Sequence, residues 1–330
     1  MRVLLIILAV LIVVPSWSGD ERRPLWDRAP RVTASRVPLS DARPDRHRLG
    51  SLVYLGGVHL SSRNWAFGGY SSLIVRGGRF LLLSDGGLTL DFAMGADWRP
   101  RDVRAGALPG GPGTGWRKSD RDSESMVADP RTGDLLVGFE RSNAIWRYDA
   151  RLTRVIRHYS PLPMKRWPRN GGAEAMAILQ DGRTIVFSED AAMPDGRPGK
   201  QALIFPGDPT DPNARPARFA FLPPDGYDPV DAAVLPDGRL LVLTRAFSVR
   251  DFFTAKLLLV DPRTIRAGAT IRGREIASFT GDVIHDNFEG LAVTREGRET
   301  IVWILSDDNG PSLFERTLLL KFRLETSGLN

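Results

Sequence analysis

Short apolar segments recur along the chain in pairs, and a turn containing Gly joins the two members of each pair. Two apolar runs around such a turn predict a β-hairpin, because Gly accepts the positive φ that tight turns require. Five hairpins of this kind follow one another at intervals of roughly 50 to 60 residues. Their first strands begin at Ser71, Glu124, Glu174, Asp231 and Glu289.

Each hairpin is followed by further strand-like segments, at residues 144–148, 202–205, 256–260 and 318–322. Units of about four antiparallel strands that repeat in this way are typical of propeller blades. We therefore expect an all-β fold, a β-propeller of five or six four-stranded antiparallel blades. A β-sandwich is the alternative, but it predicts no recurrence of one hairpin. Residues 49–58 are expected to pair with the last blade and close the ring, and a sixth, degenerate blade stays open.

The N-terminus begins with an apolar run at residues 3–14, after which small residues precede a potential cleavage site following Ser18. This pattern predicts a signal peptide over residues 1–18 and an exported protein, periplasmic or extracellular, with no membrane span once the signal is removed. An uncleaved N-terminal anchor is the alternative. Residues 19–48 are rich in Arg and Pro and predict a solvated, extended segment, and residues 49–330 are expected to form the propeller domain.

Composition removes several classes of function. The absence of Cys excludes disulfides, thiol nucleophiles and Cys-type zinc sites, and four His are too few for a His-rich metal centre. The net charge of +6 comes from scattered basic residues without a motif for nucleic acid, so no nucleic-acid partner is expected. No Gly-x-Ser-x-Gly sequence is present, which argues against a serine hydrolase. Any metal would be held by oxygen ligands.

Acidic residues recur at one position of the repeat. In a hairpin the end of the second strand returns beside the start of the first, so the two ends share one edge of the blade. If the first strands are innermost, these ends converge at one mouth of the central channel. Carboxylates in a confined site repel one another unless a cation compensates them, and Ca²⁺ takes six to eight oxygen ligands. The candidate metal ligands are Asp85, Glu124, Glu140, Glu174, Glu189, Glu289, Asp307 and Asp308.

Basic residues at the same ends of the blades are candidates for the chemistry itself. Arg141, Arg245 and Arg316 could bind phosphate oxygens through two parallel hydrogen bonds. His285, four residues before Glu289, is the candidate general acid or base, although a His at such a position is more often structural.

Several stretches of the chain resemble one family, the phytase-like proteins described as having "esterase-like activity of phytase". They are Gly68-Gly69-Tyr70-Ser71, Ser84-Asp85, Asp286-Asn287-Phe288-Glu289-Gly290-Leu291-Ala292, Ser306-Asp307-Asp308-Asn309 and Arg316-Thr317-Leu318-Leu319-Leu320. The resemblance extends over residues 49–324. It implies a propeller, an exported location and metal-assisted hydrolysis of phosphate or carboxylic esters.

We therefore expect an exported, monomeric, phytase-like hydrolase that uses Ca²⁺ and acts on a small-molecule ester or organic phosphate at the mouth of the channel. Two alternatives remain. One is a propeller that binds a ligand or partner without catalysis and holds a structural Ca²⁺. The other is a lactonase-type enzyme with an oxygen-ligated ion at its centre.

Overall fold

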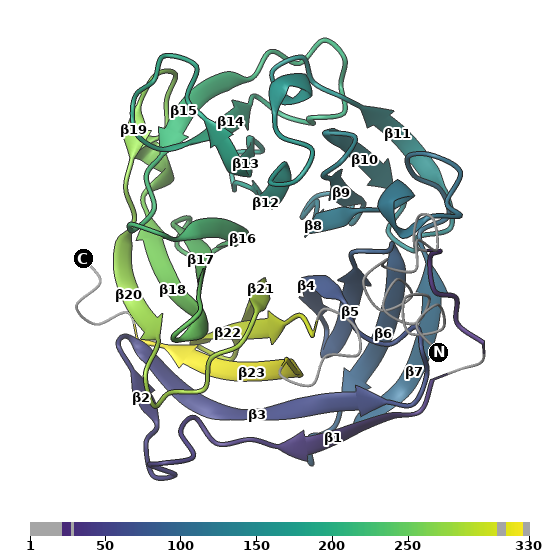
Figure 1. The fold of residues 1–330 in the computed structure, drawn as a ribbon, viewed down its shortest axis with the longest axis vertical. Coiled ribbons are helices and arrows are strands. Elements are labelled where there is room, and N and C mark those ends of the chain that lie inside the picture. The colour runs from purple at the N-terminus through teal and green to yellow at the C-terminus, as the bar shows by residue number, and fades with distance from the viewer. Residues whose placement is uncertain (1–21, 28–29, 309–314, 326–330) are drawn as a thin grey trace, which may run out of the picture.

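The computed structural model describes residues 22–27, 30–308 and 315–325, so the predicted signal peptide lies outside the described part of the chain. Five sheets stand around one axis, and the innermost strands β4, β8, β12, β16 and β21 surround it (Figure 1). This arrangement confirms the predicted all-β propeller. The described residues form five blades, and the six-bladed alternative is wrong.

The blades are numbered in chain order by their first strands. Blade 1 contains β4 (Tyr70–Arg76), β5 (Arg79–Ser84), β6 (Leu88–Met94) and β7 (Pro100–Ala107). Blade 2 contains β8 (Ser123–Ala128), β9 (Leu135–Phe139), β10 (Ala144–Tyr148) and β11 (Val155–Tyr159). Blade 3 contains β12 (Ala173–Ile178), β13 (Thr184–Ala192), β14 (Lys200–Phe205), β15 (Ala217–Phe221) and the short β19 (Thr270–Ile271). Blade 4 contains β16 (Asp228–Val234), β17 (Leu240–Ser248), β18 (Phe252–Val260) and β20 (Arg274–Phe279).

Blade 5 combines strands from both ends of the chain. Its inner strands are β21 (Phe288–Glu296), β22 (Glu299–Ser306) and β23 (Thr317–Leu324), and its outer strands are β3 (Leu52–Ser62), β1 (Val32–Arg36) and the short β2 (Arg48–Leu49). Antiparallel pairing of β3 with β23 closes the ring, as residues 49–58 predict. Since β3 leads directly into β4 of blade 1, this pairing links the last blade to the first.

The N-terminal segment departs from its predicted form. Residues 19–48 were expected to be a solvated arm, but β1 adds a further strand to blade 5 by pairing with β3. The apolar side chains of Val32 and Leu39 are buried in this segment. The segment is polar overall, but burial of these few apolar side chains stabilises its contact with blade 5.

The hydrophobic core consists of five clusters, one between each pair of neighbouring blades. Fully buried aromatic side chains fill these interfaces, among them Phe80, Phe139, Phe187 and Phe288. Burial of one such side chain contributes about 1.5–3 kcal/mol, so the contact between blades is the main source of stability. The described helices are three short 3₁₀ turns, η1 (Lys118–Asp120), η2 (Met164–Arg166) and η3 (Pro262–Thr264). Within the described residues, no helix has the length and apolar character to cross a bilayer.

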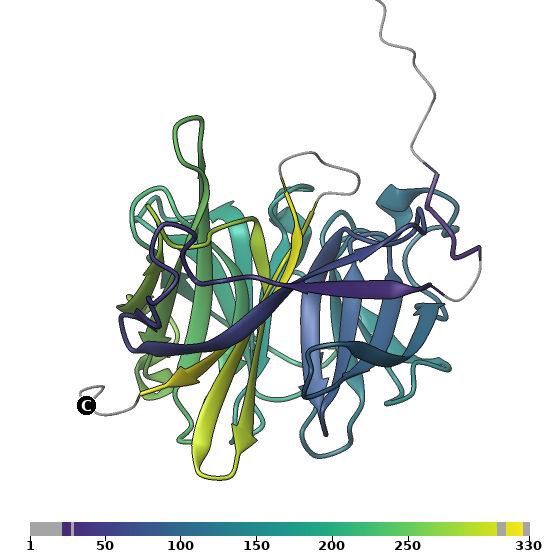
Figure 2. The same cartoon turned by 90° about the horizontal axis from the view of Figure 1, so that it is seen from below.

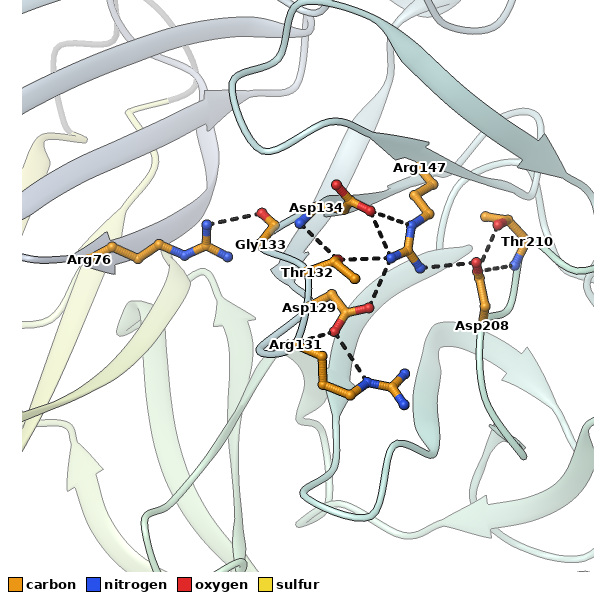
Figure 3. A network of polar contacts seen from close by, with 9 residues as sticks. All are labelled: Arg76, Asp129, Arg131, Thr132, Gly133, Asp134, Arg147, Asp208 and Thr210. Carbon is orange, nitrogen blue, oxygen red and sulfur yellow. Dashed lines mark hydrogen bonds and ion pairs between the residues drawn. The ribbon is translucent and has the colours of Figure 1, made fainter.

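A polar network joins blades 2 and 3 near the turn of the first hairpin of blade 2 (Figure 3). The guanidinium of Arg147 pairs with Asp129 at 2.9 Å, with Asp134 at 2.8 Å and with Asp208 at 3.0 Å. Arg76 of blade 1 donates to the carbonyl of Gly133 at 3.0 Å. Since Arg147 and Asp129 are largely buried, this cluster fixes three successive blades relative to one another.

Candidate functional site

The innermost strands of all five blades carry a β-bulge at the same position of the repeat. The extra residue is Ser71 in β4, Glu124 in β8, Glu174 in β12, Val230 in β16 and Glu289 in β21. A bulge turns the extra side chain out of the regular alternation of the strand. Three of the five bulges therefore bear a Glu at the same end of the channel.

The second strands of the hairpins end beside these bulges. Ser84, Phe139, Ser188, Thr244 and Ser306 are the partners that close each hairpin. The next residues in the chain are Asp85, Glu140, Glu189, Arg245 and Asp307. The repeat thus places one charged residue from each blade around the same end of the axis.

Carboxylates from blades 2 and 3 form two groups that share a residue. Ligand oxygens of Asp122, Glu124 and Glu140 lie within 4.8 Å of one another, and those of Glu140, Glu174 and Glu189 do the same. Glu140 also accepts hydrogen bonds from the backbone N–H groups of Gly171 and Gly172, at the start of blade 3. The carboxylate of Glu140 therefore lies between the two blades and belongs to both groups.

The protonation of these groups reflects burial and mutual repulsion. Burial raises the pKa of Glu124 well above its usual value, and the charges of Glu289 and Asp85 raise it further. Burial likewise raises the pKa of Glu174 well above its usual value, with added repulsion from Glu124 and Glu189. Glu124, Glu174 and Glu289 therefore influence one another across the channel, although they belong to three different blades.

Arg245 pairs with two of the carboxylates at this end of the channel. Its guanidinium donates to Glu189 at 3.1 Å, to Asn287 at 2.6 Å and also to Glu289. Burial raises the pKa of Glu289 in spite of the opposing effect of Arg245. Arg245 joins blades 3, 4 and 5. We call the set Asp85, Asp122, Glu124, Glu140, Glu174, Glu189, Arg245 and Glu289 the acidic mouth.

The inner strands surround a cavity away from the acidic mouth. It has a volume of about 280 Å³ and is lined mainly by apolar residues of all five inner strands, including Leu73, Met126, Ile178, Val234 and Val293. None of the carboxylates of the acidic mouth lines this cavity.

Four predicted ligands lie outside the two carboxylate groups: Glu289, which pairs with Arg245, and three others. The carboxylate of Asp85 forms an ion pair with Lys118 at 2.6 Å. Asp308 accepts from the backbone N–H of Gly69 and from the hydroxyl of Thr317, both at 2.8 Å, and so connects blade 5 to blade 1. Asp307 is buried at the end of β22. None of these three belongs to the two carboxylate groups found among the described residues.

The other predicted catalytic residues are distributed around the acidic mouth. Arg141 pairs with Asp122 at 2.6 Å and so lies beside one carboxylate group. Arg316 pairs with Asp286 at 3.3 Å, and Asp286 precedes the Asn287 that binds Arg245. His285 Nδ1 lies 2.6 Å from the carbonyl oxygen of Val283 in its own loop. The structure gives His285 a local structural contact and does not bring it into either carboxylate group.

Two residues of the site were not predicted. Asp122 precedes the first strand of blade 2 and joins the group around Glu124, and Asn287 positions Arg245. The pattern Asp-x-Glu at residues 122–124 is a signal for the first, because it places a second carboxylate close to Glu124 in the chain. Asn287 has no comparable pattern in the repeat.

Comparison with known families gives one match. The family model "Phytase-like: Esterase-like activity of phytase" matches residues 66–310. No curated protein sequence matches the chain.

Several solved structures are similar to this chain at low sequence identity and low TM-score. Hydrazine synthase from Kuenenia stuttgartiensis is 12% identical, with a TM-score of 0.37 over 76% of this chain; the chain spans 62% of that structure. The allergen Mala s 1 of Malassezia sympodialis is 13% identical, with a TM-score of 0.44, over 92% of this chain and 95% of the other. An α-L-arabinofuranosidase from Podospora anserina is 12% identical, with a TM-score of 0.41, over 92% and 98%.

Proposed function

Since its model matches residues 66–310, the chain belongs to the phytase-like family, and we propose that it is a hydrolase of phosphate or carboxylic esters that acts at the acidic mouth with the help of Ca²⁺. The observation on which this proposal rests is the pair of carboxylate groups that share Glu140. The proposal includes export of the protein, which is supported by the sequence pattern of residues 1–18.

The donor set of the acidic mouth fits a hard divalent cation. Its ligand atoms are all carboxylate oxygens, which Ca²⁺ prefers, and they come from side chains held in place by bulges and by backbone hydrogen bonds. Carboxylates outnumber the basic side chains with which they pair. Without a further cation, several of them must take up protons. The residues that would hold the ion are Asp122, Glu124, Glu140, Glu174 and Glu189.

Bound Ca²⁺ would supply Lewis-acid polarisation of the ester oxygen and a more acidic water. The chain itself would supply orientation. Arg245 holds Glu189 and Glu289 in fixed positions and keeps a positive charge at the acidic mouth, where an ester oxygen that gains negative charge during hydrolysis would bind. Glu289 uses Oε1 to accept from Arg245. Its Oε2 would accept a proton from the attacking water and return it to the alcohol oxygen as the ester bond breaks, a task that suits a carboxylate whose pKa is raised by burial.

The experiment that tests this proposal is hydrolysis of a mixed panel of organic phosphates, carboxylic esters and lactones by the purified protein. Activity is measured as isolated, after chelation and after return of Ca²⁺. Release of phosphate or acid that is lost on chelation and regained with Ca²⁺ is the expected result. Opening of lactones alone would assign the chain to the lactonase alternative. Stability that depends on Ca²⁺ without turnover on any substrate would make it a binding module.

A further inference from the structure

The hairpin formed by β17 and β18 extends beyond the body of the propeller. Figure 2 shows it as the green hairpin that projects at the end of the ring where β22 ends and β23 begins. The pairing is regular throughout, with Arg245 opposite Ala255, Phe247 opposite Phe253 and Ser248 opposite Phe252. We call the part of the hairpin from Arg245 to Ala255 the arm.

One face of the arm is continuous with the acidic mouth. Residues two apart in a strand, and residues directly opposite in a pair, share a face. Arg245, Phe247 and Phe253 therefore lie on one face, and Phe252 lies on the other. The Arg245 guanidinium carbon is 5.5 Å from the ring centre of Phe253, and the rings of Phe253 and Phe247 are 5.1 Å apart. Because Arg245 binds Glu189 and Glu289, this face adjoins the mouth.

The aromatic face is accessible to a ligand. The side chain of Phe247 is 62% exposed, although Phe side chains are usually buried in the core of a folded protein. Sites for small molecules combine apolar or aromatic surface with a few polar groups that converge on the reacting atoms. Here Phe247 and Phe253 supply the aromatic surface, and Arg245 with its carboxylates supplies the polar groups.

We propose that the face of the arm formed by Phe247 and Phe253 is a subsite for an aromatic group of the substrate, carried on the ester that reacts at the acidic mouth. This inference rests on the proposed hydrolase function and narrows it to aryl esters or aryl phosphates. An ester oxygen at Arg245 would leave the group attached to it beside the two rings. Aromatic contacts of this kind favour aryl over methyl substrates by a factor of about 5 to 10.

The surroundings of the arm favour a substrate over larger partners. The exposed large apolar side chains of the arm are Phe247, Val249 and Phe252. Together they offer far less than the roughly 800 Å² that each partner buries in a stable protein interface. A second copy of the chain is therefore disfavoured.

The test compares two substitutions on opposite faces of the arm. Phe247→Ala removes a ring from the proposed subsite, and Phe252→Ala removes a similarly exposed ring (58%) from the other face. The substrates are the 1-naphthyl and methyl esters of the same acid or phosphate. We expect Phe247→Ala to lower kcat/KM for the naphthyl ester about 5- to 10-fold and to change the methyl ester less than twofold. Phe252→Ala should change neither. Equal effects of the two substitutions would overturn the subsite.

A binding measurement separates the subsite from the proposed reaction. The probe is 1-naphthylmethylphosphonate, which has no ester bond to hydrolyse, titrated by its fluorescence in the presence of Ca²⁺. If the probe binds more weakly to Phe247→Ala but not to Phe252→Ala, the subsite is supported. If the protein at the same time hydrolyses no ester, the proposed reaction is wrong while the subsite stands. Unchanged affinity in Phe247→Ala overturns the subsite. Loss of vesicle binding or of a dimer in that variant, with probe affinity unchanged, would also overturn it and assign the arm to a membrane or a second copy.

Discussion

Replacement of Glu174 by Gln should stabilise the metal-free protein and reduce the further stability that Ca²⁺ supplies. An oxygen of Glu174 lies within 4.8 Å of oxygens of Glu140 and Glu189. Two unit charges at that distance repel by about 3 kcal/mol at an effective dielectric constant of 20. Protonation relieves part of this energy, so the substitution should raise the free energy of unfolding of the metal-free protein by about 1–3 kcal/mol.

The pH at which this gain is measured follows from the direction of the pKa shift. Burial raises the pKa of Glu174 in the folded protein above the value of about 4.3 expected in the unfolded chain. The stabilising contribution of its proton is therefore complete below that value and is lost as the pH rises through the raised pKa. The Gln variant should therefore gain stability relative to the metal-free wild type as the pH rises, and the comparison is made at pH 8 for that reason.

With Ca²⁺ the advantage of the variant should shrink by about 1.3 kcal/mol. Ligand at 100 times its Kd stabilises the wild type by about 2.7 kcal/mol, and a tenfold weaker site in the variant would leave about 1.4 kcal/mol. The assay is thermal unfolding at pH 8 with chelator and with Ca²⁺. Glu299→Gln, a surface change at the opposite end of β22, serves as the control and should alter neither value by more than about 0.5 kcal/mol. A metal-free Glu174→Gln variant that is less stable than the wild type, with an unchanged response to Ca²⁺, would refute the reasoning.

Three further predictions concern single residues. Arg147→Met leaves three carboxylates without their shared partner and should cost about 3–5 kcal/mol in denaturant unfolding at pH 7. Burial opposes ionisation of Asp129, but the backbone amide of Arg131 and the guanidinium of Arg147 hold its pKa below the usual value. The ionised carboxylate therefore stabilises the fold above about pH 3.9, and this stabilisation is lost as the pH falls through the lowered pKa. The loss of stability caused by Arg147→Met should accordingly be smaller near pH 3. Arg245→Gln removes the positive charge of the acidic mouth and should lower kcat while Ca²⁺ binds about tenfold more tightly in a calorimetric titration. Gly68→Ala places a Cβ inside the contact distance of Asp308 at a φ of +113°, and should lower the free energy of unfolding by about 1–3 kcal/mol in thermal denaturation.

The sequence was sufficient to predict the hairpins, the ring and its closure. Alternating apolar segments and Gly turns are local signals, and their repetition restricts the fold to a few topologies. The number of blades was not determined by these signals, because a degenerate blade would lack the recurring hairpin and so could not be excluded from the sequence. Val32 and the strand around it looked too polar to belong to a blade, and only the pairing with β3 shows that they do.

The site was predicted in part for a similar reason. Equivalent positions in a repeat lie at equivalent places in space, so the sequence located Glu124, Glu174 and Glu289. It could not show which carboxylates share an ion and which pair with basic residues, because those choices depend on rotamers and on neighbouring blades. Glu289 pairs with Arg245, whereas Glu140 is held by backbone N–H groups of the next blade. The bulges, which direct these side chains, leave no clear mark in the sequence.

The most direct test of the central claim is a calorimetric titration of the chelator-treated protein with Ca²⁺, repeated in buffers of different ionisation enthalpy. If the acidic mouth holds a cation, the titration should show saturable binding accompanied by release of protons from the carboxylates, whose pKa values are raised by burial. Absence of binding at millimolar Ca²⁺, or binding without proton release that is unchanged in Glu174→Gln, would contradict a metal site at the end of the channel.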